Sequence, residues 1–567
     1  MNLKHISWFF LFISVTLSCR NGQLYKIETG RYISVPNGMV VSAHNESSAA
    51  GVKMLLSGGN AVDAAAAAEF SLAVCYPEAG NIGGGGFMLI RLADGTTDVI
   101  DYREKAPAKA SRDMYLNEKG ELVQGLSTGT HMASGVPGTV AGIIEAHRKY
   151  GKLPFKKVIE PAIELAEKGF RINQYQANSL NNNRNRFIER NRVKTAFVKD
   201  SLWKEGDILR QPVLAKTLKR IKNKGTEGFY SGRTANLIIK EMQRGNGLIS
   251  HEDLEEYSPV WRKPLTGRYR DYEIITIPPP SAGGIILLQL LGIMENYPLK
   301  EWGFQSPETI HLIIEAEKRV FADRAEFVGD PGFVNVPVKQ LLNKSYLRLR
   351  MSDFSPGKAT PSGQISHGNP LMIENEETTH YSVVDRWGNA VAATTTLNGS
   401  FGSSIVVEGA GFLLNNEMDD FSSKPGFPNM YGLVGGDANS IQPGKRMLSS
   451  MTPAIITRND SLFMVLGSPG GSTIPTSVFQ VIINVLDFEM DIRHAVEAGR
   501  FHNQWLPDYT EFEPELFGNE TRLKLESLGH IIKRRGSLGR VNALIINRDE
   551  LIYSGADPRG NNSACGY

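Results

Sequence analysis

The sequence has very little cysteine. Cys19, Cys75 and Cys565 are the only cysteines among 567 residues. If Cys19 is removed or lipidated, only Cys75 and Cys565 could pair, so we expect no disulfide framework. Cys75 ends the apolar stretch AEFSLAVC, which predicts a buried thiol that packs as a small hydrophobic side chain.

Metal-binding motifs and clustered charge are also missing. The sequence contains no CxxC, HxxxH or HExxH pattern, so it gives little support for a metal site. The formal net charge is +2, and acidic and basic residues are interspersed. Nucleic-acid-binding proteins usually carry a clustered basic surface, so we expect no nucleic-acid partner.

Long apolar runs are confined to the N-terminus. Lys4 and His5 precede an apolar run at residues 6–17. This run is shorter than the roughly 20 residues that span a bilayer, but it fits the apolar part of an export signal. We therefore expect residues 1–18 to be a signal peptide and the mature protein to be periplasmic or secreted. Cys19 follows Leu-Ser, as in a lipoprotein signal, so lipid anchoring through Cys19 and simple cleavage both remain open.

Hydrophobic periodicity divides the chain into a part with mainly helical patterns and a part with mainly strand patterns. The first part contains helical patterns at residues 58–75, 134–151, 155–170 and 306–327, and a deeply apolar helix within 278–297. From about residue 378, three hairpin patterns follow, at residues 379–397, 451–467 and 542–556, with one buried helix at 473–488. Antiparallel hairpins combined with outer helices predict an α+β fold of two packed sheets covered by helices.

A polar stretch rich in Gly, Pro and Ser, residues 352–377, precedes the first hairpin. It predicts an exposed linker that can be cut without disturbing a core. Thr378 and Thr379 follow it directly. Strand propensity is one explanation for this threonine pair. The other is that the chain is cleaved and Thr378 becomes a new N-terminus.

The second explanation has a chemical basis. A threonine hydroxyl is a weak nucleophile and needs a base nearby. A free α-amino group has a pKa of about 7.7–8.0, close to working pH. Only an N-terminal threonine carries both groups on one residue.

Two glycine-rich stretches are candidates for anion sites. Residues 83–86 are four glycines that lead into an apolar strand, without the GxxxxGK[ST] order of a phosphate loop, so close backbone packing is favoured. GSPGGS at 467–472 runs from a strand into a helix, where free N–H groups favour negative charge. An oxyanion or phosphate site and a tight turn explain that second stretch equally well.

Taken together and in order, several motifs resemble the γ-glutamyltranspeptidase (glutathione hydrolase) family of bacterial type. The resemblance covers nearly all of residues 38–567. The motifs are GGNAVDAA, GNIGGGGFMLIRL, DYREKAPAKA, SGVPGTVAG, PPPSAGG, ADRAEFVGDP, TTHYSVVD, TTTLNGSFG, NNEMDDFS, PGFPNMYGLVGGDAN, KRMLSSMTP, GSPGGS and GRFHNQWLPD.

The resemblance implies an N-terminal-nucleophile hydrolase fold, a four-layer αββα sandwich of two stacked, mainly antiparallel sheets. It also implies a precursor that cleaves itself between Glu377 and Thr378. The products would be a large subunit, residues 19–377, and a small catalytic subunit, residues 378–567. These would form a non-covalent heterodimer, and no cofactor is implied.

The resemblance also assigns roles at the reacting end of the site. Thr378 would be the nucleophile, and Thr396 would hydrogen-bond near its amine and hydroxyl. Without the resemblance, Thr396 is a plain strand residue. Gly470 and Gly471 would supply oxyanion-hole N–H groups. Of the two explanations of GSPGGS, the resemblance therefore favours the oxyanion site.

A γ-glutamyl group carries a free carboxylate and a free ammonium, so its site needs groups of both signs. Arg103 fits the carboxylate through two parallel hydrogen bonds, with Ser449 and Ser450 as added donors. The ammonium side would consist of Asp420, Glu417 and Asn398. Residues 425–436 would form a lid with Tyr431 as its cover, although a plain surface loop has the same composition. Taken singly, Arg103 fits a surface ion pair and the serines fit a turn.

The sequence therefore predicts an exported γ-glutamyltransferase and glutathione hydrolase, with amino acids or dipeptides as acceptors. One alternative is an acylase of the same fold that cuts glutaryl-β-lactams or related amides. Because a glutaryl group lacks the α-ammonium, it gives no role to Asp420. A second alternative is a non-catalytic periplasmic binding lipoprotein, which would stay uncleaved.

Overall fold

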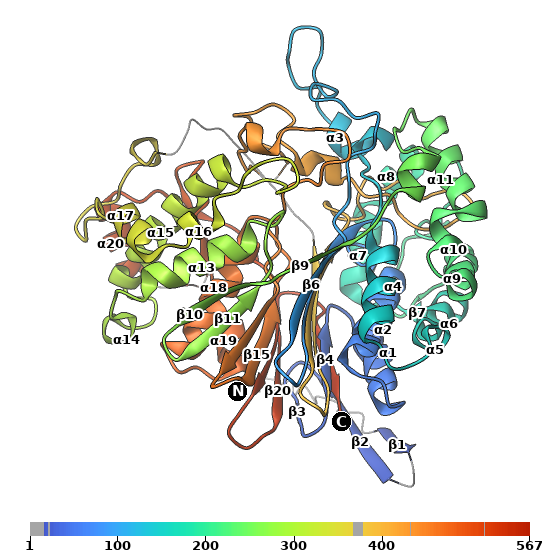
Figure 1. Ribbon diagram of the computed structural model, residues 1–567, viewed down its shortest axis with the longest axis horizontal. Coiled ribbons are helices and arrows are strands. Elements are labelled where there is room, and N and C mark those ends of the chain that lie inside the picture. The colour runs from blue at the N-terminus through green and yellow to red at the C-terminus, as the bar shows by residue number, and fades with distance from the viewer. Residues whose placement is uncertain (1–15, 21–22, 367–377, 431, 515, 517) are drawn as a thin grey trace, which may run out of the picture.

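Two large sheets lie face to face at the centre of the computed structural model, and helices cover both outer faces (Figure 1). The structure describes residues 16–20, 23–366, 378–430, 432–514, 516 and 518–567, with side chains from residue 25 onwards. This arrangement confirms the predicted α+β class and the four-layer αββα architecture.

The first sheet has nine strands, and neighbouring strands run antiparallel. Its strands, in spatial order, are β1 (Thr16–Arg20), β2 (Gln23–Gly30), β21 (Ser563–Gly566), β4 (Met39–Ser42), β12 (Thr379–Val384), β13 (Ala390–Thr396), β5 (Gly85–Arg91), β6 (Thr97–Asp101) and β9 (Val260–Arg262).

The second sheet has seven strands, also antiparallel. Its strands, in spatial order, are β10 (Leu265–Tyr269), β11 (Tyr272–Thr276), β14 (Ala454–Arg458), β15 (Ser461–Gly467), β19 (Asn542–Ile546), β20 (Ile552–Ala556) and β3 (Ser34–Val35). Both sheets take strands from before and after residue 378, so the two predicted subunits would share one fold.

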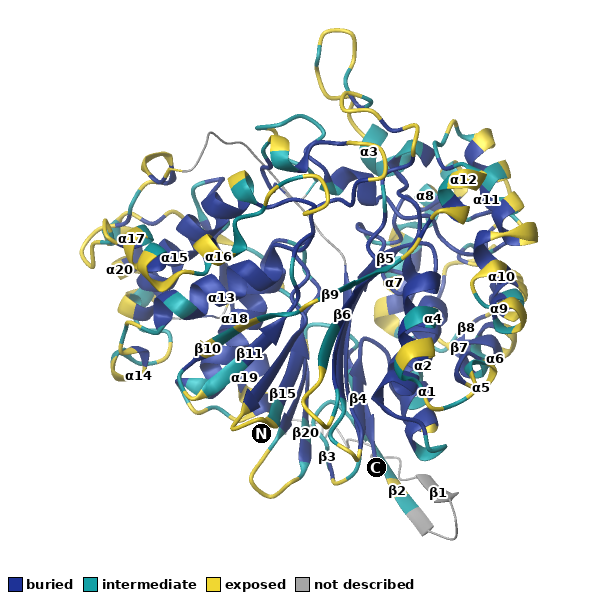
Figure 2. Cartoon of the chain, in the orientation of Figure 1, coloured by how far each residue is buried: buried dark blue, intermediate teal, exposed yellow. Residues whose placement is uncertain are grey.

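Alternation along the strands produces three apolar layers, because successive side chains point to opposite faces of a sheet. In β5, Met88 and Ile90 pack towards the helices, while Phe87 and Leu89 pack between the sheets. In β11, Ile274 faces the other helix layer. The central strands are therefore buried on both faces, as Figure 2 shows.

The helices form two outer layers. On the nine-stranded sheet lie α1 (Asn45–Leu56), α2 (Ala61–Cys75) and α4 (Thr139–Tyr150), with α6 (Glu160–Lys168), α9 (Pro212–Lys224) and α11 (Gly232–Arg244) further out. On the seven-stranded sheet lie α13 (Gly283–Met294), α15 (Pro307–Phe327), α18 (Thr473–Leu486) and α19 (Ile492–Glu497), with α17 (Lys344–Arg350) and α20 (Asn519–Leu528) outside them.

The predicted helices and hairpins are present, with one difference. Residues 155–170 form two short helices, α5 (Phe155–Val158) and α6, instead of one. Pro161 lies in the first turn of α6, the position where a residue without an N–H is tolerated, so the chain restarts there. The first strand of the leading hairpin begins at Thr379, as predicted.

The structure also bears on the predictions about disulfides, the signal peptide and membrane spans. Cys75 and Cys565 are buried and free, as expected for a chain without a disulfide framework. Most of the predicted signal peptide, residues 1–15, lies outside the described residues, and β1 spans the predicted cleavage point before Cys19. None of the described helices combines the length and the apolar composition that a membrane span needs.

Helix α2 places the buried acid Glu69 beneath the leading hairpin. Glu69 is fully buried on this alanine-rich helix, and Tyr381 of β12 and Thr395 of β13 lie against its carboxyl. Burial raises the pKa of Glu69 to about 8, and the two hydroxyls offset this effect only in part. Glu69 therefore stays protonated at neutral pH in the folded protein.

This raised pKa predicts a pH-dependent stability. The folded state keeps a proton that the unfolded state loses near pH 4.5, so the stability that this proton contributes falls as pH rises towards about 8. Glu69→Gln has no proton to lose at this position, so this contribution to the pH dependence of stability should vanish. The free energy of unfolding of the variant, relative to that of wild type, should therefore rise between pH 5 and 8. The slope of this difference against pH should approach about 1.4 kcal/mol per pH unit.

Urea unfolding at several pH values measures this difference. Glu164→Gln on α6, where the side chain is 43% exposed, is the matched control and should run parallel to wild type. A Glu69→Gln curve that also runs parallel to wild type would contradict the buried, protonated state.

Candidate active site

Thr378 and Thr396 lie side by side at one end of the leading hairpin. The pairing of Thr379 with Thr395 fixes the register, and one further step places Thr378 opposite Thr396. Thr378 is buried, with 6% of its surface exposed, and both threonines line one cavity. Thr396 Oγ1 accepts a hydrogen bond of 2.7 Å from the Asn398 N–H. The hairpin thus presents two hydroxyls to the same space.

That cavity is lined by most of the predicted site residues. Its walls are formed by Arg103, Thr378, Thr396, Asn398, Asp420, Leu433, Leu448, Ser449, Ser450, Met451, Gly471 and Ile474. Its volume of about 20 Å³ is room for about one water molecule, so a ligand the size of an amino acid requires its walls to move apart. Gly470 and Glu417 lie just outside the lining, and Tyr431 lies outside the described residues.

The turn from β15 to α18 forms one wall. Gly470 and Gly471 have φ angles of 128° and 49°, in the region that favours glycine. A Cβ atom on Gly470 would lie 2.6 Å from Thr473 Oγ1, which excludes larger residues. The turn is therefore tight, and it places Gly471 at the cavity beside the N-terminus of α18. Free N–H groups at such a terminus favour a negative charge, so the two explanations of GSPGGS are compatible.

The other glycine stretch packs against the same hairpin. β13 pairs with β5 from Ala390 to Thr396, opposite Arg91 to Gly85. A Cβ on Gly84 would lie 2.1 Å from Thr396 O, and one on Gly86 would lie 2.3 Å from Thr394 O. Only glycine allows this approach, which confirms close backbone packing as the explanation for residues 83–86.

Arg103 is the charged centre of the site. Its side chain is fully buried, and Nη1 lies 2.5 Å from Glu417 Oε2 and 3.5 Å from Glu104 Oε2. Nη2 is also bonded to Asp420 Oδ2. Glu417 and Asp420 begin and end a single 3-10 turn, so both side chains point the same way, towards the guanidinium. The residue predicted for a substrate carboxylate is thus held by the residues predicted for an ammonium.

One guanidinium faces three carboxyl groups, and the pKa values of all four groups are shifted. Burial raises the pKa of Glu417, Asp420 and Glu104, that of Glu104 to about 8, while Arg103 opposes the rise. The acidic neighbours raise the pKa of Arg103, which therefore stays charged. Asp420 is the most exposed of the three acids, at 13% of its side chain, and it is the one that reaches the cavity.

Ser449 and Ser450 differ in what they can offer. Ser449 Oγ accepts the Met451 N–H at 3.0 Å, and its backbone is fixed by the Pro280 carbonyl at 2.9 Å. Within the described part of the chain, the buried hydroxyl of Ser450 has no hydrogen-bond partner. Ser450 therefore has a donor available for a ligand in the cavity.

The predicted lid stretch is attached at its base. Met430 N–H donates to Asp419 Oδ2 at 2.8 Å, and the Met430 sulfur lies 3.8 Å from Asn398 Nδ2. Asn398 itself has a positive φ of 73°, which turns the chain after β13 towards this stretch. Leu433, which follows Tyr431 by two residues in the sequence, lines the cavity. The stretch therefore borders the site, while the covering role of Tyr431 stays a prediction.

The apolar part of the cavity lining is not among the residues that the sequence predicts for the site. Leu433, Leu448, Met451 and Ile474 line the cavity but carry no reactive group that marks them as site residues. Leu433 lies within PGFPNMYGLVGGDAN, Leu448 and Met451 lie within KRMLSSMTP, and Ile474 follows GSPGGS by two residues. This position is the only signal in the sequence that marks them. Among the described residues, the lining holds a single acid, Asp420, and no histidine or cysteine.

The arrangement suits acyl transfer. A buried hydroxyl, a helix N-terminus and a matched cation and anion surround one small space. Groups of these kinds can supply a nucleophile, donors for a developing oxyanion, and contacts for a zwitterionic group.

Comparisons with known proteins agree with this chemistry. The γ-glutamyltranspeptidase family model matches residues 47–567. The glutathione hydrolase proenzyme of Escherichia coli is 45% identical over 533 residues, which is 93% of this chain and 91% of that protein. The acylase ACY 1 proenzyme of a Pseudomonas species (strain V22) is 37% identical over 529 residues, covering 92% and 91%.

Two solved structures extend the comparison. A Bacillus halodurans cephalosporin acylase superimposes with a TM-score of 0.82 at 25% identity and covers 100% of this chain and 99% of its own. A Helicobacter pylori γ-glutamyltranspeptidase chain has 45% identity and a TM-score of 0.56, covering 58% of this chain and 94% of its own. With the family model spanning most of its length and a relative at 45% identity, this chain belongs to the γ-glutamyltranspeptidase family.

Proposed function

We propose that this protein is a γ-glutamyltransferase and glutathione hydrolase that uses Thr378 as its nucleophile. The observation that carries the proposal is the convergence of Thr378, Thr396, Gly471, Arg103 and Asp420 on one buried cavity. The relatives named glutathione hydrolase proenzymes support the same activity.

The active enzyme arises by cleavage between Glu377 and Thr378. Before cleavage, the Thr378 hydroxyl attacks the carbonyl of Glu377, and the resulting ester is opened by water. This frees the α-amino group of Thr378, which then acts as the base for its own hydroxyl. Glu377 lies outside the described residues, and the proenzyme names of the relatives support this step.

Turnover then has two stages. The Thr378 oxygen attacks the γ-carbonyl of the donor, the α-amino group passes the hydroxyl proton to the leaving amine, and a γ-glutamyl ester forms. N–H groups of the Gly470–Gly471 turn stabilise the oxyanion. Water then releases glutamate, or the amine of an amino acid or dipeptide takes the γ-glutamyl group. Thr396 orients the Thr378 hydroxyl and amine throughout.

Binding exchanges ion pairs inside the cavity. Arg103 releases Asp420 to hold the substrate α-carboxylate, with Ser450 as a second donor, and Asp420 turns to the α-ammonium, beside Asn398. The substrate brings one charge of each sign, so the buried charge stays balanced. Glu417 remains on Arg103 and fixes the guanidinium.

Around this site, residues 19–377 and 378–567 stay together as a non-covalent heterodimer, because both sheets contain strands of each part. The protein is exported and is either free in the periplasm or medium, or lipid-anchored through Cys19. Tyr431 covers the glutamyl pocket.

An acylase that removes a glutaryl group is the second candidate, because a cephalosporin acylase superimposes over the whole chain. Asp420 separates the two functions. A glutaryl group has no ammonium to meet this carboxylate, and burying Asp420 against it would leave the acid without a counter-charge.

The nucleophile can be tested first. Thr378→Ala removes the attacking hydroxyl, so the purified protein should remain a single uncut chain without activity on a γ-glutamyl anilide. Denaturing gel electrophoresis and anilide release measure the two effects. In the described part of the chain the buried Thr379 hydroxyl lacks a partner, so Thr379→Val is a matched control and should be cleaved normally. Two normal subunits from Thr378→Ala would refute the assignment.

Arg103 can be tested without removing its charge. Arg103→Lys keeps the cation that Glu417 and Asp420 need, but loses the paired hydrogen bonds to a carboxylate. A charge-assisted hydrogen bond contributes about 1.5–3 kcal/mol, so KM for the γ-glutamyl anilide should rise at least about tenfold. Steady-state kinetics of the processed variant measure this, and an unchanged KM would exclude the proposed contact.

Asp420 can be tested by comparing donors. Wild type should release the anilide from the γ-glutamyl compound far faster than from its glutaryl counterpart, and a dipeptide should accelerate the γ-glutamyl reaction. Asp420→Asn removes the ammonium partner, so the ratio of kcat/KM between the two donors should fall by at least about tenfold. A wild-type preference for the glutaryl donor would instead establish the acylase function.

A further inference from the structure

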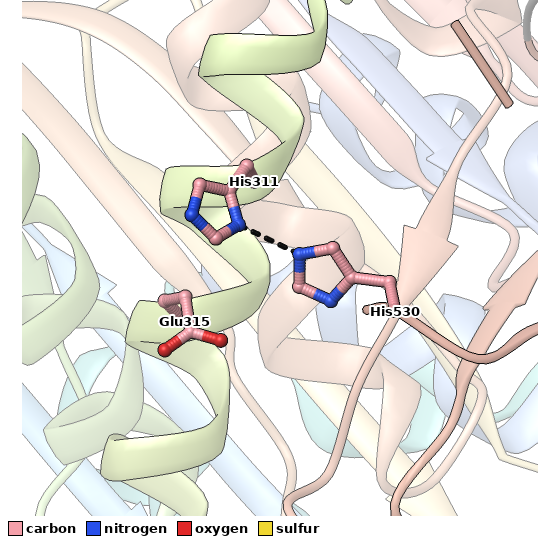
Figure 3. Close-up of side chains that lie close together, drawn as sticks. All are labelled: His311, Glu315 and His530. Carbon is pink, nitrogen blue, oxygen red and sulfur yellow. Dashed lines mark hydrogen bonds between the residues drawn. The ribbon is translucent and has the colours of Figure 1, made fainter. Parts of the chain in front are cut away.

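A second cluster of functional side chains lies in the helix layer of the seven-stranded sheet, apart from the cavity lining. It consists of His311 and Glu315 of α15 and His530, two residues beyond α20 (Figure 3). We propose that these three residues bind a divalent transition-metal ion, with Zn²⁺ as the best match.

The geometry is that of a three-ligand site. His311 and Glu315 are four residues apart on α15, so their side chains project from the same face. His530 faces them, and its Nε2 lies 2.7 Å from His311 Nδ1. One ligand atom from each of the three residues lies within 4.8 Å of the others, and all three residues are buried.

The surrounding hydrogen bonds orient the ligands. His311 Nε2 lies 2.8 Å from the Ser355 carbonyl oxygen, which can only accept, so the proton belongs on Nε2 and the lone pair on Nδ1 faces His530. Metal-bound histidines usually donate their second ring N–H to a carbonyl or carboxylate in this way. Glu315 is oriented too, since Oε1 accepts the Thr360 N–H at 3.0 Å and Oε2 accepts from Arg319 at 2.8 Å.

His530 completes the ligand set. In the described part of the chain, the buried Nδ1 of His530 has no hydrogen-bond partner. No contact at Nδ1 fixes the tautomer of this ring, so its proton can lie on Nδ1 while Nε2, which faces His311, binds an ion.

The donor set selects the ion. Two imidazoles and one carboxylate suit Zn²⁺ and its neighbours better than Mg²⁺ or Ca²⁺, which prefer oxygen ligands. Nitrogens bound tetrahedrally to Zn²⁺ at about 2.0–2.1 Å are roughly 3.3 Å apart, so the two rings need to separate by only about half an ångström.

Two cations set an upper limit on affinity. Arg319 is paired with Glu315, and Lys318 Nζ lies 3.8 Å from Glu315 Oε1. They reduce the negative charge that Glu315 offers to an ion, and Lys318 is itself shared with Asp508 at 3.1 Å. Binding should therefore be weaker than in a three-ligand site without neighbouring cations.

The position of the cluster gives the ion a structural role, and this part of the inference depends on the proposed cleavage. His311 and Glu315 precede residue 378, whereas His530 follows it. In the cleaved protein, a bound ion would join the large subunit to the small one. Ion binding itself does not require cleavage.

Binding can be measured on the purified, metal-stripped protein by titration with Zn²⁺, and by the visible absorption of Co²⁺, which reports nitrogen ligation. We expect one ion per chain in both the processed protein and the uncut Thr378→Ala variant. His530→Gln and His311→Gln should each weaken binding at least about tenfold. His494→Gln, which removes an exposed histidine paired with Asp491, is the matched control and should bind as wild type does.

Subunit separation in urea tests the bridging role. Zn²⁺ should raise the urea midpoint for separation of the processed subunits, EDTA should reverse the shift, and His530→Gln should abolish it. Absence of Co²⁺ absorption and of Zn²⁺ binding in wild type would overturn the site, even if the variants fail to fold. Binding that is equally strong in His530→Gln would also overturn it. If the chain is not cleaved, Zn²⁺ should still bind, as it should in Thr378→Ala. The proposed cleavage and the proposed metal site can therefore be refuted independently.

Discussion

The pairing of β12 with β13 is the interaction on which the site depends. It places Thr378 beside Thr396, and it holds because both strands are buried on both faces, between α2 on one side and the seven-stranded sheet on the other. A slip of one residue would turn Tyr381 and Val383 towards the wrong layer, so the register is strongly fixed. The position of Thr378 at the edge of the cavity follows directly from this register.

The second constraint is charge. Arg103 is buried in contact with three carboxyl groups, so the cation and the acids of the site are paired with each other. This costs stability, because each buried charge has left water, but it provides both signs that a zwitterionic group requires. The cavity is small because these charged side chains contact each other and so occupy the space that a ligand would need.

Much of the architecture could be predicted from local patterns. The capping box of Asn60 and Asp63, the three hairpins and the apolar helices α13 and α18 all follow from residues close in the chain. The family motifs added the site residues, and most of these do line one cavity. Local pattern could not show the ion pair between Arg103 and Asp420, which are 317 residues apart, nor the apolar lining, because leucine and methionine are common everywhere in a core.

The sequence by itself determined the order of the elements, the register-setting alternation of the strands, the glycines at the β15–α18 turn and a threonine at the start of the hairpin, because these depend on neighbours in the chain. Only the tertiary structure decided which charges meet at Arg103 and that His311, Glu315 and His530 meet at all, since His311 and His530 are 219 residues apart. The physical reason is that contacts of this kind depend on how the packed layers bring distant segments together, which no local pattern encodes.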